Sequence, residues 1–175
     1  MHTGNVFSSS ELQKVNDAVA LAEELVSNYF KISSGQWLRM KYDVKTAEQL
    51  NSSERVDGPF AQVVGYDGKK KDTQLGSSRF TYYTVCLQDG AILDAVRRND
   101  ELMLFPFLVY IVVHELVHIV RFGRFQQIYS ASSIAEHAMN EEIKVHDITW
   151  KILSEESLPG MDKVLEYYKK WIEKK

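Results

Sequence analysis

Apolar residues recur at helical spacing in several stretches of the chain and predict its main helices. In residues 11–31 they return every three or four positions, beside Ser10-Glu11-Leu12-Gln13, which matches a capping box. The same spacing predicts long helices over 102–122 and 134–153, a short helix over 91–98 and a final helix over 161–173.

Between the first helix and residue 91, alternation of apolar and polar residues predicts a small sheet. Ser78–Gln88, rich in Thr, Tyr, Phe and Val, is the strongest predicted strand, and Phe60–Tyr66 is a shorter one. Gln36–Lys45 alternates more loosely, and Asp89-Gly90 ends the strongest strand with a turn. The order of a helix, a small sheet and further helices predicts an α+β fold.

Length and composition predict one folded domain. The chain of 175 residues is expected to form a single domain over 1–175, in which 1–100 supplies the first helix and the sheet and 101–175 supplies the remaining helices. Its 45% hydrophobic and 26% charged residues are ordinary for a globular domain that folds without a structural metal. Any bound metal is therefore expected to serve chemistry.

Charge and targeting patterns narrow the classes of partner. The net charge is −3, and the basic cluster 69–71 lacks the aromatic or basic neighbours of a nucleic-acid surface, so no nucleic-acid partner is expected. The N-terminal residues lack the pattern of a signal peptide, which favours the cytoplasm. The apolar stretch Met103–Val120 contains His114, Glu115 and His118, which favours a buried helix over a membrane span.

The main chemical signal is His114-Glu115-Leu116-Val117-His118, which fits the pattern H-E-x-x-H. Positions i and i+4 lie on one face of a helix, so both imidazoles can bind one metal ion with Glu115 beside it. Zinc lowers the pKa of a bound water to about 7, and Glu115 is placed to accept its proton as general base. The surrounding helix is apolar on every side, so these polar side chains need a partner.

A catalytic zinc site needs a third protein ligand, and the helix predicted over 134–153 offers three candidates. Projected on that helix, Glu142 falls within the apolar face, and so does His146 at i+4, whereas Glu141 lies at the edge of the face. We predict Glu142 as the third ligand. His146 is then the residue that orients Glu142, or a ligand in its place.

These residues resemble the gluzincin branch of the zincin metallopeptidases, the group that includes thermolysin. In that branch a glutamate on a later helix completes the H-E-x-x-H site, and His118 is not followed by the G-x-x-H of metzincins. Residues 138–143 are also similar to the thermolysin-type ligand helix, A-x-N-E-x-x-x-D. That alignment would place the ligand on Glu141 and leaves Val145 where the family has a carboxylate.

The resemblance implies a zincin-like fold that holds one Zn²⁺ per chain and hydrolyses a peptide or protein substrate. It also implies that an edge strand pairs with extended substrate, and Ser78–Gln88 is the expected strand. Tyr129, Tyr167 and Tyr168 are candidates for the residue that stabilises the transition state. The leading hypothesis is therefore a zinc metallopeptidase.

Three other readings share part of this pattern. The same ligands would serve a zincin-like protein that acts on one regulatory target or merely binds it. Glu115-x-x-His118 also matches the Glu-x-x-His unit of carboxylate-bridged di-iron bundles. Those proteins, however, consist of four long helices without a sheet. Without a metal, His114 and His118 would be core histidines held by hydrogen bonds.

Overall fold

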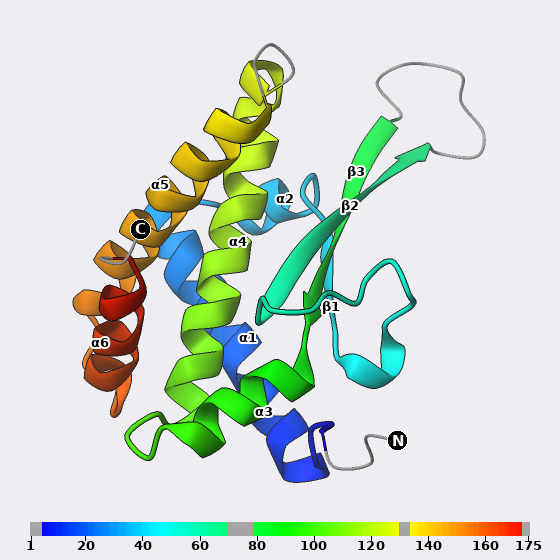
Figure 1. The fold of residues 1–175 in the computed structure, drawn as a ribbon. Helices are drawn as coiled ribbons and strands as arrows, with labels where there is room; N and C mark the ends of the chain where they lie inside the picture. The colour runs from blue at the N-terminus through cyan, green and yellow to red at the C-terminus, as the bar shows by residue number, and fades with distance from the viewer. Residues whose placement is uncertain (1–4, 70–78, 130–133, 173–175) are drawn as a thin grey trace.

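The computed structural model describes residues 5–69, 79–129 and 134–172 and shows a mixed α+β fold (Figure 1). The described elements are α1 (Ser9–Phe30), α2 (Ser34–Trp37), β1 (Tyr42–Lys45), the 3₁₀ helix η1 (Ala47–Gln49), β2 (Ala61–Lys69), β3 (Arg79–Leu87), α3 (Asp89–Arg98), α4 (Leu104–Tyr129), α5 (Ile134–Ser154) and α6 (Met161–Ile172). The predicted α+β class is thus confirmed, with six α-helices and one three-stranded sheet in the described part of the chain.

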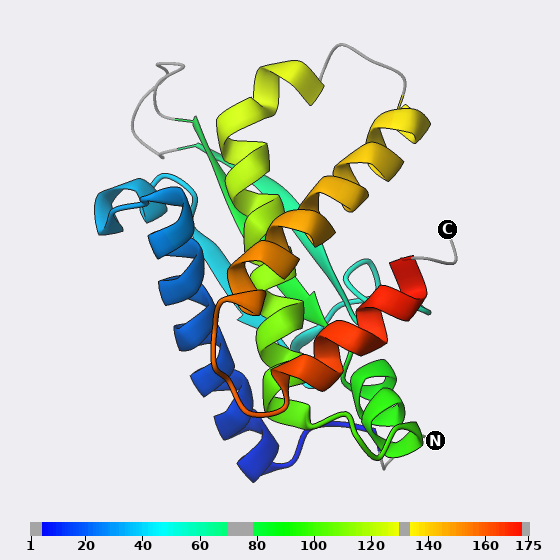
Figure 2. The same cartoon turned by 90° about the vertical axis from the view of Figure 1, so that its left-hand side faces the viewer.

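Helix α4 lies at the centre of the fold. Figure 1 shows α5 and α6 on one side of it and the sheet on the other, and Figure 2 shows α1 running alongside. All residues from Phe107 to Val117 are buried, as expected for a helix that is apolar on every side. The stretch Leu104–Arg124 is long and apolar enough to cross a membrane by length and composition alone, but 78% of the 18-residue segment within it that meets this test is buried inside the fold.

The sheet has the strand order β1-β3-β2, with β1 parallel and β2 antiparallel to β3. The prediction that Ser78–Gln88 is an edge strand is therefore wrong, because β3 is the central strand. Tyr83 to Leu87 are all buried, on both faces of the sheet, which is the burial expected of a central strand. The strand that lies beside α4 at the edge is β2.

Local capping explains two further differences from the predicted elements. Helix α1 is capped by Ser8 with Glu11, so the capping box begins two residues earlier than predicted. A second capping box, Ser33 with Gln36, starts α2 at Ser34, so this helix takes in the first two residues of the predicted strand Gln36–Lys45, of which only Tyr42–Lys45 is extended.

The central helix also runs further than predicted, through Gly123 to Tyr129. Gly123 therefore does not end the helix. A Cβ atom at this position would lie 2.6 Å from Met40 Sδ, so the absence of a side chain makes room for Met40 to pack there.

Candidate metal centre

Two helices supply the polar side chains at the centre of the fold. Helix α4 carries Tyr110, His114 and His118 at intervals of four residues, so all three lie on one face. Helix α5 crosses this face and carries Glu142 and His146, which are also four residues apart. The structure therefore brings together four of the predicted site residues, two from each helix.

The carboxylate of Glu142 lies among three imidazoles. His114 Nε2 is 2.9 Å from Glu142 Oε1, and His118 Nε2 is 3.1 Å from Oε2. His146 Nε2 is 3.4 Å from Oε1. The histidine side chains are 9 to 13% exposed, whereas that of Glu142 is 40% exposed, so Glu142 is the most exposed of these four side chains.

The cluster offers more donor atoms than a three-ligand site needs. His114, Glu142 and His146 place donor atoms within 4.8 Å of one another, and His118 lies against the second carboxylate oxygen. A site with three protein ligands keeps a position open for water, and one with four is closed. Imidazoles and a carboxylate are typical zinc ligands. Whether a metal bound here would keep a coordination position free for water depends on whether His146 is a fourth ligand.

Glu141 has a different partner. Its two carboxylate oxygens accept hydrogen bonds from Nε and Nη2 of Arg121, one turn beyond the histidines on α4. The structure therefore brings Glu142, and not Glu141, against the imidazoles. The pair of Arg121 and Glu141 joins α4 to α5 beside the cluster, and such two-bond pairs fix geometry as well as charge.

Burial and charge shift the pKa of each group in the cluster. Burial lowers the pKa of His114 to about 4, so its imidazole is neutral, which is the form that binds metals. Burial would raise the pKa of Glu142, but hydrogen bonds from the three histidines lower it far below its usual range. Burial also opposes the charged form of His118, whose pKa is nonetheless raised because of its bond to Glu142.

Glu115 lies on the same turn of α4 and is 7% exposed. Burial raises the pKa of its carboxyl to about 7, with the Glu142 carboxylate raising it further and His118 opposing the shift. A carboxyl with a pKa near the working pH can both accept and donate a proton, as general acid–base catalysis requires.

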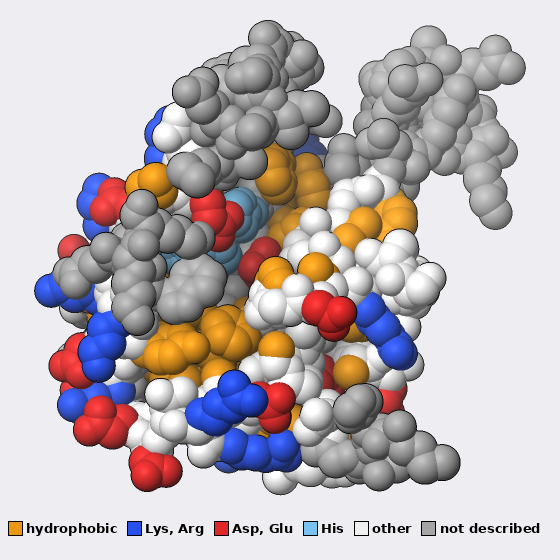
Figure 3. All heavy atoms as spheres, in the orientation of Figure 1, with side chains coloured by type: hydrophobic (Ala, Val, Ile, Leu, Met, Phe, Trp, Pro, Cys, Tyr) orange, Lys and Arg blue, Asp and Glu red, His pale blue; other side chains and the backbone are white. Residues whose placement is uncertain are grey.

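The cluster opens into a cavity of about 640 Å³. Figure 3 shows histidine and carboxylate surface in a hollow bordered by hydrophobic side chains. The lining includes Phe60 to Val63 from the start of β2 and the segment before it, Phe122 from α4, and Tyr167 and Tyr168 from α6. The cavity thus has an acidic, histidine-lined floor and mostly apolar walls, within the size range of ligand-binding clefts.

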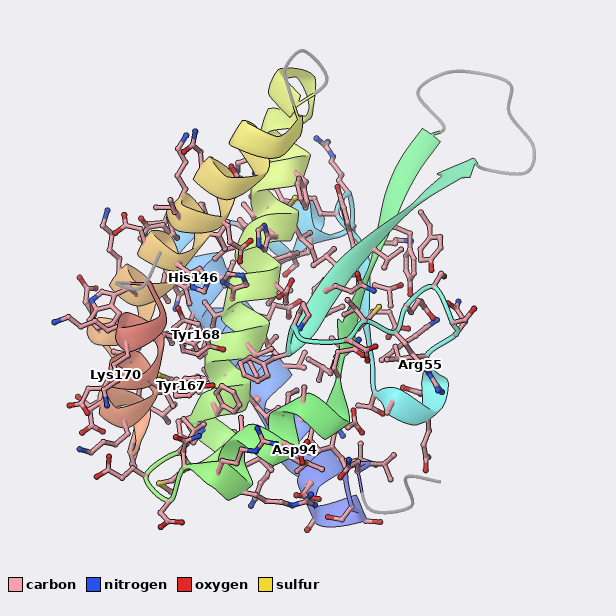
Figure 4. All side chains as sticks on the ribbon, in the orientation of Figure 1. Arg55, Asp94, His146, Tyr167, Tyr168 and Lys170 are labelled. Atoms are coloured by element: carbon pink, nitrogen blue, oxygen red, sulfur yellow. The ribbon has the colours of Figure 1, made fainter. Side chains whose placement is uncertain are left out.

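The sequence did not single out Tyr110, which contacts the cluster directly. Its hydroxyl lies 2.8 Å from His146 Nδ1, and its ring stacks on Tyr168 with centroids 3.8 Å apart. Figure 4 shows Tyr168 and Tyr167 reaching from α6 toward α4, below His146. Of the three tyrosines predicted from the family resemblance, these two line the cavity, and the side chain of Tyr129 lies outside the described residues.

His114 and His118 are oriented by packing as well as by Glu142. The Nδ1 atoms of both rings are buried and have no hydrogen-bond partner in the described part of the chain. The two rings meet edge to face at 4.8 Å between centroids, and His118 stacks on Phe122 at 5.8 Å. Metal-binding imidazoles commonly donate the other ring N–H to an acceptor, so here ring packing replaces that contact.

Comparisons of the chain with known proteins identified no relative, so the functional argument rests on the geometry of the site. No protein-family model matches the sequence, and neither the curated proteins nor the solved structures gave a match.

Proposed function

We propose that the protein is a zinc-dependent metallopeptidase of the gluzincin type with a zincin-like fold. One observation carries the proposal: the two imidazoles of the H-E-x-x-H sequence on α4 both contact the carboxylate of Glu142 on α5. Two imidazoles and a carboxylate on facing helices are the ligands expected of such a zinc site. His114, His118 and Glu142 are the proposed ligands of one Zn²⁺.

A zinc ion held there would act as a Lewis acid toward water and toward the carbonyl oxygen of a peptide. Glu115 lines the cavity beside the proposed ligands and accepts a proton from the attacking water, whose oxygen bonds to the carbonyl carbon. Glu115 then donates that proton to the amide nitrogen as the C–N bond breaks. Its pKa of about 7 suits both transfers.

The substrate is proposed to lie along β2. Phe60 to Val63 line the cavity, and in the described part of the chain no strand pairs with the outer edge of β2. An extended peptide can add to such an edge through backbone hydrogen bonds. The strand that binds substrate is then β2, in place of the β3 segment that the sequence predicted.

The substitution Glu115→Gln tests the proposed chemistry. The variant should still bind about one zinc per chain, because Glu115 is not a ligand, and should lose hydrolysis of a peptide library by roughly 10²- to 10⁴-fold. Zinc content by mass spectrometry and peptide cleavage by liquid chromatography measure the two effects separately. Full activity in this variant would refute the role of Glu115.

The same experiment separates the other functions that the sequence left open. Bound zinc with no cleavage of any library peptide by the unmodified protein would favour a regulatory protein that binds or cleaves a single target. Two iron ions per chain would favour the di-iron class.

A further inference from the structure

His146 has two ring nitrogens with different partners. Nδ1 lies 2.8 Å from the hydroxyl of Tyr110, and Nε2 lies 3.4 Å from Glu142 Oε1. Tyr110 is 1% exposed, and its ring is held against Tyr168 at 3.8 Å, so its hydroxyl cannot turn to solvent. The hydroxyl hydrogen of Tyr110 therefore needs a hydrogen-bond acceptor inside the protein.

The position of that hydrogen determines the tautomer of His146. Burial raises the pKa of Tyr110, so its phenol keeps its proton. In the described part of the chain, His146 Nδ1 is the partner recorded for this hydroxyl, and a buried hydroxyl hydrogen without an acceptor is costly. Nδ1 must then accept the bond and carry no hydrogen. The ring hydrogen is on Nε2, which faces the Glu142 carboxylate.

We propose that Tyr110 is a positioning residue that fixes His146 as a hydrogen-bond donor to Glu142. In the metal-free protein all three imidazoles turn Nε2 toward Glu142. The Nδ1 atoms of His114 and His118 have no partner among the described residues, so these two rings can carry their hydrogen on Nδ1 and offer the Nε2 lone pair to a metal ion. In His146 the Tyr110 hydroxyl occupies Nδ1, so the hydrogen stays on Nε2 and His146 is excluded from the ligands although it lies within their reach. The tautomer follows from contacts within this chain. Its consequence, a site of three ligands with one open position, rests on the proposed function.

Nitrogen NMR tests the tautomer directly and needs no metal. Long-range proton–nitrogen spectra of the uniformly ¹⁵N-labelled protein distinguish a ring nitrogen that bears hydrogen from one that does not, and His146→Ala assigns the signals. We expect His146 with a bare Nδ1 and a protonated Nε2 in the metal-free and the zinc-loaded protein. A proton on Nδ1 in the metal-free protein would overturn the proposal.

Matched variants show whether Tyr110 is the cause. Tyr110→Phe removes the hydroxyl and should shift His146 toward a mixture of tautomers. Tyr168→Phe removes the hydroxyl of the ring stacked on Tyr110 and should leave the tautomer unchanged. Identical His146 signals in Tyr110→Phe and the unmodified protein would overturn the proposal even if both bind zinc normally.

Cobalt loading tests the consequence for the ligands. With Co²⁺ in excess, His146→Ala should keep one metal per chain and the visible absorption of the unmodified protein. Its affinity should fall by roughly 10- to 100-fold, as expected when the partner of a ligand is lost. A changed absorption spectrum at full occupancy would make His146 a ligand. Failure of every form to bind Co²⁺ or Zn²⁺ would refute the proposed function and leave the NMR result standing.

Discussion

At the scale of single residues, buried polar atoms divide into those with a partner and those without one. Three imidazoles are directed at Glu142, whose pKa is lowered as a result. By contrast, Thr84 Oγ1 on β3 is buried, and it has no hydrogen-bond partner in the described part of the chain. A buried hydroxyl without a partner reduces stability, because it has lost its bonds to water.

Thr84→Val should therefore stabilise the protein. Valine has nearly the same shape as threonine and favours strands, and the substitution removes the unpartnered hydroxyl. We expect the free energy of unfolding to rise by up to about 1 kcal/mol, measured by urea denaturation.

Thr149 provides the matched control on α5. Its Oγ1 donates a hydrogen bond of 2.7 Å to the backbone oxygen of Val145, so Thr149→Val removes a bond that is made. That variant should lose about 0.5 to 1.5 kcal/mol. Equal destabilisation by both substitutions would show that Thr84 has a partner in the folded protein.

The sequence could predict some of the site residues because their spacing and chemistry are local. Glu142 and His146 fall on the apolar face of a helix, where a charged or titratable group needs a partner. The structure places Glu142 against His114 and His118, and the ring of His146 against that of His114. Tyr110 gives no such signal, because a tyrosine on a helix that is apolar all round is ordinary core. Its role depends on the crossing of α4 and α5, which is a tertiary contact.

At the scale of elements, helix positions followed from periodicity, whereas strand order did not. The order β1-β3-β2 depends on pairing between strands that are far apart in the sequence. The apolar run of β3 indicates that this strand is buried, but it does not indicate which strands pair with it. The short helix α2 was missed because its capping box, Ser33 with Gln36, outweighs a weak alternation of apolar residues.

Asp89 in the first turn of α3 joins three elements. Its Oδ2 accepts a hydrogen bond from the backbone N–H of Phe7, just before α1, and its Oδ1 accepts one from Ala47 at the start of η1. Asp89→Ala leaves both N–H groups without this acceptor. We expect a loss of about 1 to 3 kcal/mol in the free energy of unfolding, measured by urea denaturation.

Asp94, on the same helix, is the control for charge and helix propensity. Its side chain is 45% exposed and pairs only with Arg97 at the surface among the contacts described (Figure 4). Asp94→Ala should change stability by less than about 0.5 kcal/mol. If Asp94→Ala lowered the free energy of unfolding as much as Asp89→Ala, the effect of Asp89→Ala could not be attributed to its hydrogen bonds to Phe7 and Ala47.

At the scale of the whole molecule, the two portions of the chain expected from the sequence meet at the cavity. The start of β2 comes from the first 100 residues, and the histidines, Glu115, Glu142 and the tyrosines of α6 come from the rest. The residues of the candidate site were predictable within the helical portion. The proposed substrate edge was not, because it depends on how the sheet is placed against α4.

The proposed substrate edge predicts a specific effect at Val63. The backbone N–H of Gln88 bonds to the oxygen of Phe60, and the antiparallel register then directs the backbone groups of Val63 away from β3. Val63→Pro should remove an N–H that pairs with substrate and lower kcat/KM about tenfold with zinc retained. Val63→Ala, which keeps the N–H, should retain most of the activity. Equal losses in the two variants would count against pairing along β2.

The measurement that tests the central claim most directly is zinc content by mass spectrometry after loading and dialysis. It compares the unmodified protein with Glu142→Gln and Glu141→Gln. These glutamates are adjacent in sequence, and the first contacts the imidazoles whereas the second pairs with Arg121. The account predicts about one zinc per chain in the unmodified protein and in Glu141→Gln, and almost none in Glu142→Gln. No zinc in the unmodified protein, or loss in Glu141→Gln alone, would contradict it.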